Sequence, residues 1–377
     1  MKKIFSFILT LLITFLPVFN INNLSFADSE PNLTAEYAVL MDYETGQVLY
    51  SKNGYNKLYP ASTTKAWTAY VVLKHVSDLN QVVEIKDLPI VDGSSMYLKE
   101  GEAFTVKELL DALLIHSSND VAMVLAKYVG GSVENFVNMM NNEAKAIGAK
   151  NTHFNNPNGL PDENHYTTAS DMAKIAKSAW MNPLYRKFCT RRYYEIPPTN
   201  KFAEARQLLN HHKMIKNGEY YYEGVLGGKT GYTDASGNTL VTYCRRGNTT
   251  LVAVILNSTS AANAYGDTAS LFDYGFGNFE KTDMKVSMEP VPFKVLPCDK
   301  YILKNNGNTY PFYYKTKVYV TLPKGIDKSQ LTKRQAVLQN AAGLLRLKSK
   351  YYYKKQMVGW GMQYERNVVS DLLVQAS

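Results

Sequence analysis

The chain has 377 residues, of which 45% are hydrophobic and 20% are charged. These are ordinary values for globular proteins, and they argue against a largely disordered chain, a collagen-like fibre or a polytopic membrane protein. The formal net charge of +9 is unevenly spread: residues 281–377 hold 17 Lys and Arg against 6 Asp and Glu, whereas residues 1–280 hold 25 against 27. A basic C-terminal part on a mildly acidic body predicts an anionic partner, such as nucleic acid, anionic lipid or an anionic polymer.

The first residues predict export. A short basic start, Lys2-Lys3, precedes the uncharged apolar run 4–19, and Ser25 and Ala27 place small residues at a cleavage site. This pattern is typical of a secretory signal peptide over residues 1–27, and a retained N-terminal anchor is the alternative. An exported protein rarely meets nucleic acid, so we expect no nucleic-acid partner and favour a membrane surface or a wall polymer for the basic part.

The cysteines indicate neither a disulfide framework nor a metal site. Cys189, Cys244 and Cys298 are far apart and odd in number. They are expected to be buried small apolar residues. No metal-binding motif is present, and we expect no metal or cofactor.

The expected elements alternate between strands and helices along the chain. Residues 38–50 predict a β-hairpin with its turn at 44–46. Apolar residues at helical spacing predict helices over 63–76 and 105–115, from a break at 116–119 through 128, and over 133–147 and 170–181. Residues 229–256 alternate as paired strands with a turn at 245–248, and a helix over 261–274 follows. Strands at both ends with helices between them predict one α/β layered unit.

The character of the sequence changes near residue 280. Short runs rich in Tyr, Val and Lys between 281 and 321 predict a separate small β domain, behind a linker near 277–287. The last stretch, 367–376, is a candidate short apolar helix.

Three short motifs carry candidate chemistry. Ser62 and Lys65 are three residues apart at a helix start, so both side chains lie on one helix face. A serine hydroxyl is a weak nucleophile that needs a base, and a lysine amine serves only when it is neutral. Burial and a nearby cation such as Lys229 would lower the pKa of Lys65. The N–H groups at the start of the helix would face the developing oxyanion.

The other motifs complement this pair. In the helix break, Ser117 can pass a proton to a leaving amine and Asn119 can hold a substrate amide. At the start of a strand, Lys229 and Thr230 offer a cation and a hydroxyl to a carboxylate, and Gly231 leaves room for a substrate backbone. Each motif alone has an ordinary explanation, namely a capping serine, loop residues or a strand turn. Their order and their placement on the expected elements argue against coincidence.

With these motifs in place, the chain resembles the serine-type D-alanyl-D-alanine carboxypeptidases, the low-molecular-mass penicillin-binding proteins. The resemblance spans roughly 35–279 and includes the blocks LMDYETGQVLYSKN, YPASTTKAWTAY, SSNDVA, THFNNPNGLPDENHYTTASDMAKIA and GGKTGYTDASGNTLV. It implies an α/β (α+β) fold of the penicillin-recognising, β-lactamase-like type, with an antiparallel sheet flanked by helices. A catalytic domain over 28–280 and a basic β-rich domain over 281–377 are expected.

The resemblance also implies roles. Ser62 is the expected nucleophile, Lys65 its base and Ser117 part of the proton network. Asn119, Lys229, Thr230 and Gly231 are expected to bind substrate, and the Tyr232 N–H is expected to pair with that of Ser62 in the oxyanion hole. The implied reaction removes the terminal D-Ala of peptidoglycan pentapeptides outside the cytoplasm, at the wall or the outer membrane face, with β-lactams as inhibitors.

Alternatives and departures remain at this stage. A β-lactamase would need a deacylating ExxLN loop, yet Glu163 is followed by Asn-His-Tyr-Thr. An endopeptidase of the same fold and a non-catalytic wall-binding protein are further alternatives. Residues 367–376 do not resemble the family's terminal membrane helix, and the stretch 331–364 matches the family poorly. Residues 236–238 also differ from the expected run. The six histidines are interpreted as structural.

Overall fold

The computed structural model describes residues 30–88, 90–215, 217–284, 290–291, 310–314, 317–339 and 345–365. The predicted signal peptide, Cys298 and the candidate helix 367–376 lie outside these ranges. Across the described ranges, no helix is both long enough and apolar enough to cross a membrane.

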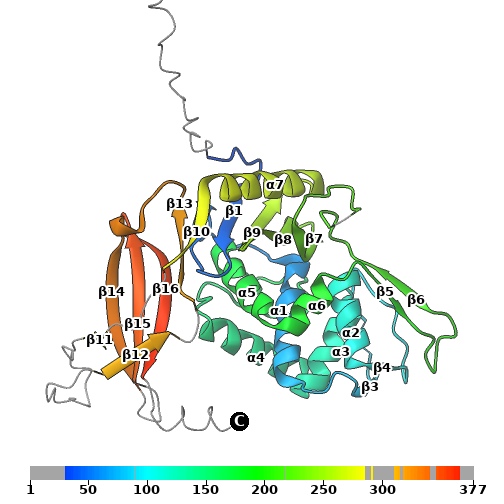
Figure 1. Ribbon diagram of the computed structural model, residues 1–377. Coiled ribbons are helices and arrows are strands. Elements are labelled where there is room, and N and C mark those ends of the chain that lie inside the picture. Colours follow the sequence, from blue (N-terminus) through cyan, green and yellow to red (C-terminus); the bar gives the residue numbers. More distant parts are fainter. Residues whose placement is uncertain are drawn as a thin grey trace, which may run out of the picture.

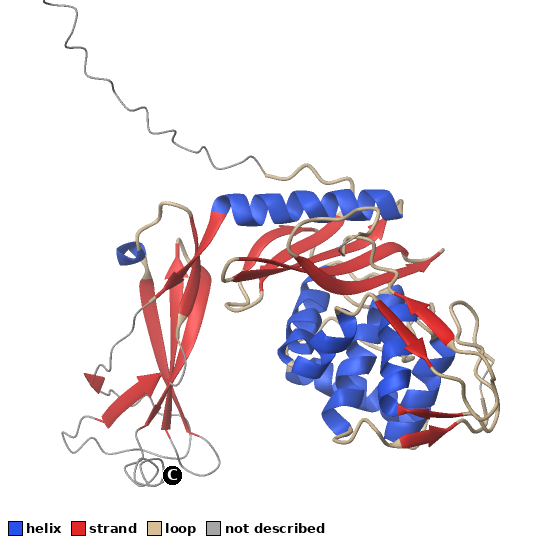
Figure 2. Ribbon diagram, turned by 45° about the vertical axis from the view of Figure 1, so that its right-hand side comes forward, coloured by secondary structure: helices blue, strands red, loops and turns tan. Residues whose placement is uncertain are grey.

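An antiparallel sheet forms the centre of the larger, N-terminal unit (Figures 1 and 2). The strand order is β2-β1-β9-β8-β7, with bounds Val48–Lys52, Tyr37–Asp42, Thr249–Ser258, Gly237–Arg246 and Val225–Thr233. The hairpin and the paired strands predicted from alternation are confirmed. Because the sheet order leaves β7 at one edge, the residues of that strand remain available for pairing with another backbone.

Helices cover both faces of this sheet. The long helix α7, Ala261–Asn278, lies along one face, and a helical layer fills the other (Figure 2). That layer holds α1 Thr64–His75, α2 Val106–Asp111, α3 Asn119–Gly130, α4 Val133–Ala146, α5 Ala169–Met181 and α6 Pro183–Cys189. Two small hairpins, β3 Val82–Glu84 with β4 Ala103–Thr105 and β5 Tyr193–Ile196 with β6 Arg206–Leu209, border it.

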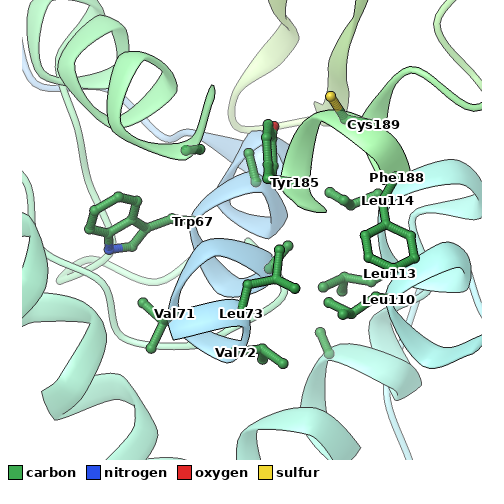
Figure 3. Packing of buried hydrophobic residues seen from close by; sticks show 14 of the residues in the cluster. Trp67, Val71, Val72, Leu73, Leu110, Leu113, Leu114, Tyr185, Phe188 and Cys189 are labelled. Carbon is green, nitrogen blue, oxygen red and sulfur yellow. The ribbon is translucent and has the colours of Figure 1, made fainter. Parts of the chain in front are cut away.

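Helix α1 runs through the middle of the helical layer. Its side chains are buried almost all the way round, as in a helix surrounded by protein. Trp67 is fully buried, stacks on Tyr70 and donates from Nε1 to the Met140 carbonyl. Apolar side chains of α2 and α6 pack against the other side of α1 (Figure 3). Cys189 and Cys244 are buried free thiols, as predicted.

Two local geometries differ from the predicted helices. The helix expected over 63–76 begins as a 3₁₀ turn, η1 Ala61–Thr63, before α1. The helix expected over 105–115 is α2 followed by a wider π-helical turn, η2 Ala112–His116. That turn ends at Ser117, whose φ of 65° is left-handed. Such insertions often occur at functional sites because they redirect the chain.

The C-terminal unit is β-rich, which confirms the predicted fold class. Its sheet has the order β10-β13-β16-β12-β11, and β14 and β15 extend from β16. The bounds are β10 Phe279–Asp283, β11 Pro290–Val291, β12 Tyr310–Tyr314, β13 Tyr319–Pro323, β14 Thr332–Gln339, β15 Leu345–Tyr353 and β16 Gln356–Glu365, with a 3₁₀ turn at Lys328–Gln330. The stretch 331–364, which matched the family poorly, is mostly strand.

The expected linker near 277–287 is wrong in its described part. Helix α7 continues to Asn278 and β10 begins at Phe279, because β10 pairs along its whole length with β13. The turn between β1 and β2 contacts this second sheet, where the hydroxyls of Thr45 and Thr321 lie 3.0 Å apart. The predicted boundary after residue 280 stays a prediction.

Candidate active site

Ser62 lies on η1, at the N-terminal end of α1. Two threonine hydroxyls donate to the carbonyl of Pro60, two residues before Ser62: Thr63 at 2.6 Å and Thr239 of β8 at 3.1 Å. Ala61 has a φ of 48°, an unfavourable value for a residue with a side chain. The Ala61 carbonyl also faces Gly159, where an added Cβ would lie only 1.9 Å from the oxygen. Contacts from the rest of the fold therefore hold the turn that presents Ser62.

Lys65 approaches Ser62 from inside the protein. Its Nζ lies 2.7 Å from Ser62 Oγ and donates to the Asn158 carbonyl at 2.6 Å. The side chain is fully buried. Burial lowers the pKa of Lys65 well below its usual value, and the nearby Lys229 lowers it further, against the opposing effect of Asp120. The physical environment therefore favours the neutral amine that a base requires.

A second serine–lysine pair lies close enough to this one for its lysine to act electrostatically on Lys65. Lys229 Nζ donates to Ser117 Oγ at 2.9 Å and to the Thr230 carbonyl at 2.9 Å. Lys229 is almost completely buried, and burial lowers its pKa to about 7. The amine of Lys229 is directed at Ser117 within the site. Thr230 is the next residue of the Lys229-Thr230-Gly231 motif, and its side chain, which carries a hydroxyl, is half-buried.

Asn119 opens α3 directly after the π-helical turn. Its amide nitrogen donates to the Asp92 carbonyl, and its backbone N–H donates to Ser94. Its side-chain oxygen Oδ1 is buried and has no hydrogen-bond partner within the described part of the chain. Because a buried acceptor without a partner is costly, this oxygen is suited to a donor supplied by a bound molecule.

Strand β7 passes very close to Ser62. An added Cβ on Gly231 would lie 2.8 Å from the Ser62 backbone nitrogen and 2.5 Å from Thr239 Oγ1, so only glycine fits without a shift. Tyr232, the next residue, is 60% exposed, and its hydroxyl donates to Asp234. The close approach places the backbone of the edge strand beside the backbone of the serine turn.

The structure brings five of the predicted site residues into direct contacts, namely Ser62, Lys65, Ser117, Lys229 and Gly231. Ser62 with Lys65 and Ser117 with Lys229 form two short pairs, and Gly231 joins the strand to the serine turn. Thr230 and Tyr232 are direct sequence neighbours of these residues, and Asn119 follows Ser117 by two residues. This is the constellation for acyl transfer: a hydroxyl nucleophile beside a buried amine, with backbone N–H groups close by.

Asp120 supports the site and was not singled out by the sequence motifs. Its carboxylate accepts from the Ser95 hydroxyl and from the backbone N–H groups of Met96, Leu98 and Val121. It fixes the 94–98 segment against the start of α3. Only its position next to the second motif hinted at a role in the site.

His165 is a structural support, in keeping with its interpretation from sequence. Its Nδ1 accepts the backbone N–H groups of Asn155 and Asn156, and its Nε2 lies 3.0 Å from Thr64 Oγ1. The ring is buried, and burial lowers its pKa to about 4. The neutral ring therefore fastens the 155–166 loop to the start of α1.

Solved structures with a similar fold include a penicillin-binding protein and a D-alanyl-D-alanine carboxypeptidase. Penicillin binding protein 5 from Haemophilus influenzae aligns over 90% of this chain and 98% of its own, with a TM-score of 0.71 and 27% identity. A D-alanyl-D-alanine carboxypeptidase from Francisella tularensis aligns over 93% and 99%, with a TM-score of 0.69 and 25% identity. The fold and the site therefore define a serine hydrolase of the penicillin-binding class.

The family follows from the sequence comparisons. The D-alanyl-D-alanine carboxypeptidase family, peptidase S11, matches residues 24–260. DacF of Bacillus subtilis is 34% identical over 74% of this chain and 72% of its own length, and DacA of Haemophilus influenzae is 30% identical over 80% and 76%. Both are D-alanyl-D-alanine carboxypeptidases. The chain belongs to this family of serine-type carboxypeptidases, which confirms the predicted enzyme class.

Proposed function

We propose that this chain is an exported carboxypeptidase that removes the terminal D-Ala from peptidoglycan stem peptides through an acyl-enzyme on Ser62. The observation that supports it most is the 2.7 Å distance between Ser62 Oγ and the Nζ of the fully buried Lys65. This pair supplies an activated nucleophile without a histidine or a metal.

Acylation starts at this pair. The neutral amine of Lys65 takes the hydroxyl proton as Ser62 Oγ attacks the carbonyl carbon of the penultimate D-Ala. The resulting oxyanion is stabilised by the N–H groups of Ser62 and Tyr232. The C–N bond then breaks, the proton held by Lys65 passes through Ser117 to the leaving amine, and free D-Ala departs. Water cleaves the ester in the second step and restores Ser62.

The remaining groups orient the peptide. The terminal carboxylate meets the Thr230 hydroxyl, in the field of the Lys229 ammonium. The side chain of Asn119 bonds a substrate amide through its unpartnered Oδ1. The peptide backbone then lies antiparallel along the open edge of β7, where Gly231 leaves room for it. β-Lactams follow the same first step and stop at a stable ester on Ser62.

The acyl-enzyme is tested with a fluorescent penicillin. The wild-type protein should be labelled, and Ser62→Ala should not, with Ser260→Ala as a matched control at another helix start. Labelling of Ser62→Ala, or none of the wild type, would refute an acyl-enzyme on Ser62.

The reaction is tested with two substrates, a pentapeptide and a crosslinked muropeptide. A carboxypeptidase releases one D-Ala from the first and leaves the second intact. Cleavage of the crosslink would instead favour the endopeptidase alternative.

Export is part of this proposal and has its own test. The N-terminal sequence predicts removal of residues 1–27 on secretion. Mass spectrometry of the exported protein should therefore find a chain that begins at Asp28. A protein that retains residues 1–27 would favour an N-terminal anchor.

The C-terminal sheet presents a basic and aromatic face, which we assign to an anionic membrane surface. Along β15 the odd-numbered residues 347, 349 and 351 are buried, so Lys348, Lys350 and Tyr352 point outward. In the strand register, Lys350 lies opposite Arg334 of β14 on one side and opposite Trp360 of β16 on the other. The Lys348 ammonium lies 4.9 Å from the Trp360 ring centre, and Trp360 is 41% exposed. Cations around an exposed tryptophan suit the headgroup layer of an anionic bilayer.

Vesicle binding tests this assignment. The mature chain should bind vesicles with anionic lipid more strongly than neutral vesicles, and Lys348→Glu with Lys350→Glu should weaken this binding at least about fivefold. Lys324→Glu with Lys328→Glu, outside the face, is the matched control. Equal vesicle binding by both double variants would refute the assignment. If the Lys348→Glu, Lys350→Glu variant lost binding to isolated cell wall but not to vesicles, a wall polymer would be favoured instead.

A further inference from the structure

A cavity of about 460 Å³ lies beside the serine turn and is not used by the proposed mechanism. This volume lies within the usual range of ligand pockets, about 300–1,000 Å³. The side chains relevant to its chemistry are those of Lys57, Tyr59, Glu163, Tyr166, Ser236 and Asn257.

Three of the segments that form the cavity walls also hold the active site. Tyr59 immediately precedes Pro60, whose carbonyl anchors the serine turn. Ser236 closes the turn after β7, where its hydroxyl bonds the Thr233 N–H and side chain. The 163–166 segment is fastened to α1 through His165. The cavity is therefore built at the C-terminal end of β7.

The direction of the substrate leads into this cavity. This step rests on the proposed function. If the terminal carboxylate meets Thr230 and the peptide runs antiparallel to β7, each earlier residue lies about 3.3 Å further towards Thr233. The terminal D-Ala and the penultimate D-Ala occupy the space beside Thr230 and Gly231. The third residue from the C-terminus then lies at the end of β7, beside the cavity.

The cavity holds two opposite charges and aromatic surface. The Lys57 ammonium lies 4.0 Å from the centre of the Tyr166 ring. Lys57 and Glu163 are both exposed. No ion pair joins either of them to another side chain within the described ranges. Tyr59 and Tyr166 are half-buried and line the same cavity. A cation and an anion that do not pair with each other can each accept a charge from a ligand.

We propose that this cavity binds the side chain of the third residue from the peptide C-terminus and selects a diamino acid whose far end carries both an ammonium and a carboxylate. Glu163 accepts the ammonium, and Lys57 pairs with the carboxylate. The methylene chain lies against the rings of Tyr59 and Tyr166. An ammonium alone would satisfy only Glu163, and an uncharged chain would satisfy neither.

Three pentapeptides that differ only at this residue test the proposal. Their side chains are diaminopimelyl, which has both charges, lysyl, which has the ammonium alone, and norleucyl, which has neither. For the wild type we expect kcat/KM to fall about three- to tenfold at each step, mainly through KM. If the wild type cleaves none of the three, the proposed function fails; if it cleaves all three equally well, only the cavity assignment fails.

Two variants separate the two charges. Glu163→Gln should remove the preference for lysyl over norleucyl, and Lys57→Met should remove the preference for diaminopimelyl over lysyl. Each preference is a ratio within one variant, so a general loss of activity cancels. Glu134→Gln and Lys150→Met, on the exposed surface elsewhere, should keep both wild-type ratios. Unchanged ratios in Glu163→Gln and Lys57→Met would overturn the assignment.

Discussion

The Nζ of Lys65 lies 2.7 Å from the Oγ of Ser62, and no part of the lysine is exposed to solvent. A buried ammonium beside a second lysine is unfavourable, so the pKa of Lys65 is lowered and the neutral form gains population. A neutral amine at hydrogen-bond distance can accept the serine proton. The helical spacing and the burial of this pair together make a base from a side chain that is normally an acid.

Replacing Lys65 tests this relationship. Lys65→Arg keeps the positive charge, but a guanidinium does not lose its proton near neutral pH, and Lys65→Met removes the amine. Both variants should acylate at least about 10²- to 10⁴-fold more slowly. The measurement is the rate of labelling by a fluorescent penicillin, with the melting temperature checked for each variant.

Lys74 provides the matched control on the same helix. Its side chain is partly exposed and pairs with Glu143 at 2.6 Å, away from Ser62. Lys74→Met should therefore be labelled at the wild-type rate. A wild-type labelling rate in Lys65→Arg would show that charge, and not proton acceptance, is what the site needs from Lys65.

Lys229 imposes a pH-dependent stability cost. Burial lowers its pKa to about 7, against about 10.4 in an unfolded chain. Below pH 7 the amine is protonated in both states, so the folded protein bears the full cost of burying the cation. From pH 7 to about 10 the unfolded state binds more protons, and stability rises with pH. Above that range the amine is neutral in both states, and the cost is gone.

The variant Lys229→Met should reveal this cost. At pH 6 it should be more stable than the wild type, by up to about 4 kcal/mol, and the difference should shrink towards pH 10. Denaturant unfolding at pH 6, 8 and 10 measures it. Lys150→Met, at an exposed lysine, should show no such trend. A stability difference that is the same at all three pH values would contradict a lowered pKa for Lys229.

Gly231 sets the spacing between β7 and the serine turn. In Gly231→Ala the new Cβ would lie 2.8 Å from the Ser62 nitrogen and 3.1 Å from the Ala61 side chain, so the turn must move away from the strand. The N–H groups of Ser62 and Tyr232 would then no longer converge. Loss of one such donor costs about 10²- to 10³-fold in rate, and we expect a drop of that order in acylation.

Gly266 in α7 is the control for this substitution. An added Cβ there meets nothing within 4 Å, and alanine is a better helix former than glycine. Gly266→Ala should keep full acylation and slightly raise the melting temperature. If Gly231→Ala acylates as fast as Gly266→Ala, the close approach of β7 has no catalytic role.

The sequence predicted the elements whose side chains repeat with a clear period. The β1–β2 hairpin, α1 and the strands β7 to β9 fall where alternation and helical spacing placed them. It did not predict η1 or the π-helical turn before Ser117, because the fold imposes both. Gly159 packs against the Ala61 carbonyl, and the backbone N–H of Asn119 donates to the Ser94 carbonyl. Both contacts join residues that are far apart in the sequence, so no local pattern reveals them.

The site was predictable as a set of residues but not as a set of contacts. The motifs named Ser62, Lys65 and Lys229, yet only the fold shows that Lys229 points at Ser117. Asp120 and His165 act through backbone N–H groups of loops, which no side-chain pattern reveals. In β15, Lys and Tyr occupy outward positions and a Tyr is also buried, so the alternation of polar and apolar residues is weak.

The contact between the two units includes a pair of buried hydroxyls. Thr45 Oγ1, in the β1–β2 turn, lies 3.0 Å from Thr321 Oγ1 of β13, and both residues are buried. Lys281 lies 3.5 Å from Glu44 in the same turn, and Gln356 donates to the Val48 carbonyl at 3.1 Å. A hydrogen bond of this kind contributes about 0.5–1.5 kcal/mol.

A double-mutant cycle with Thr45→Val and Thr321→Val isolates this bond. Thr45 also bonds Asp42, so each single variant removes more than the shared contact, and only the coupling reports on the interface. We expect a coupling of about 0.5–1.5 kcal/mol in the free energy of unfolding, measured by denaturant titration of the four proteins. Because the bond joins the two units, a coupling of zero would mean that the β1–β2 turn does not rest on the second sheet in solution.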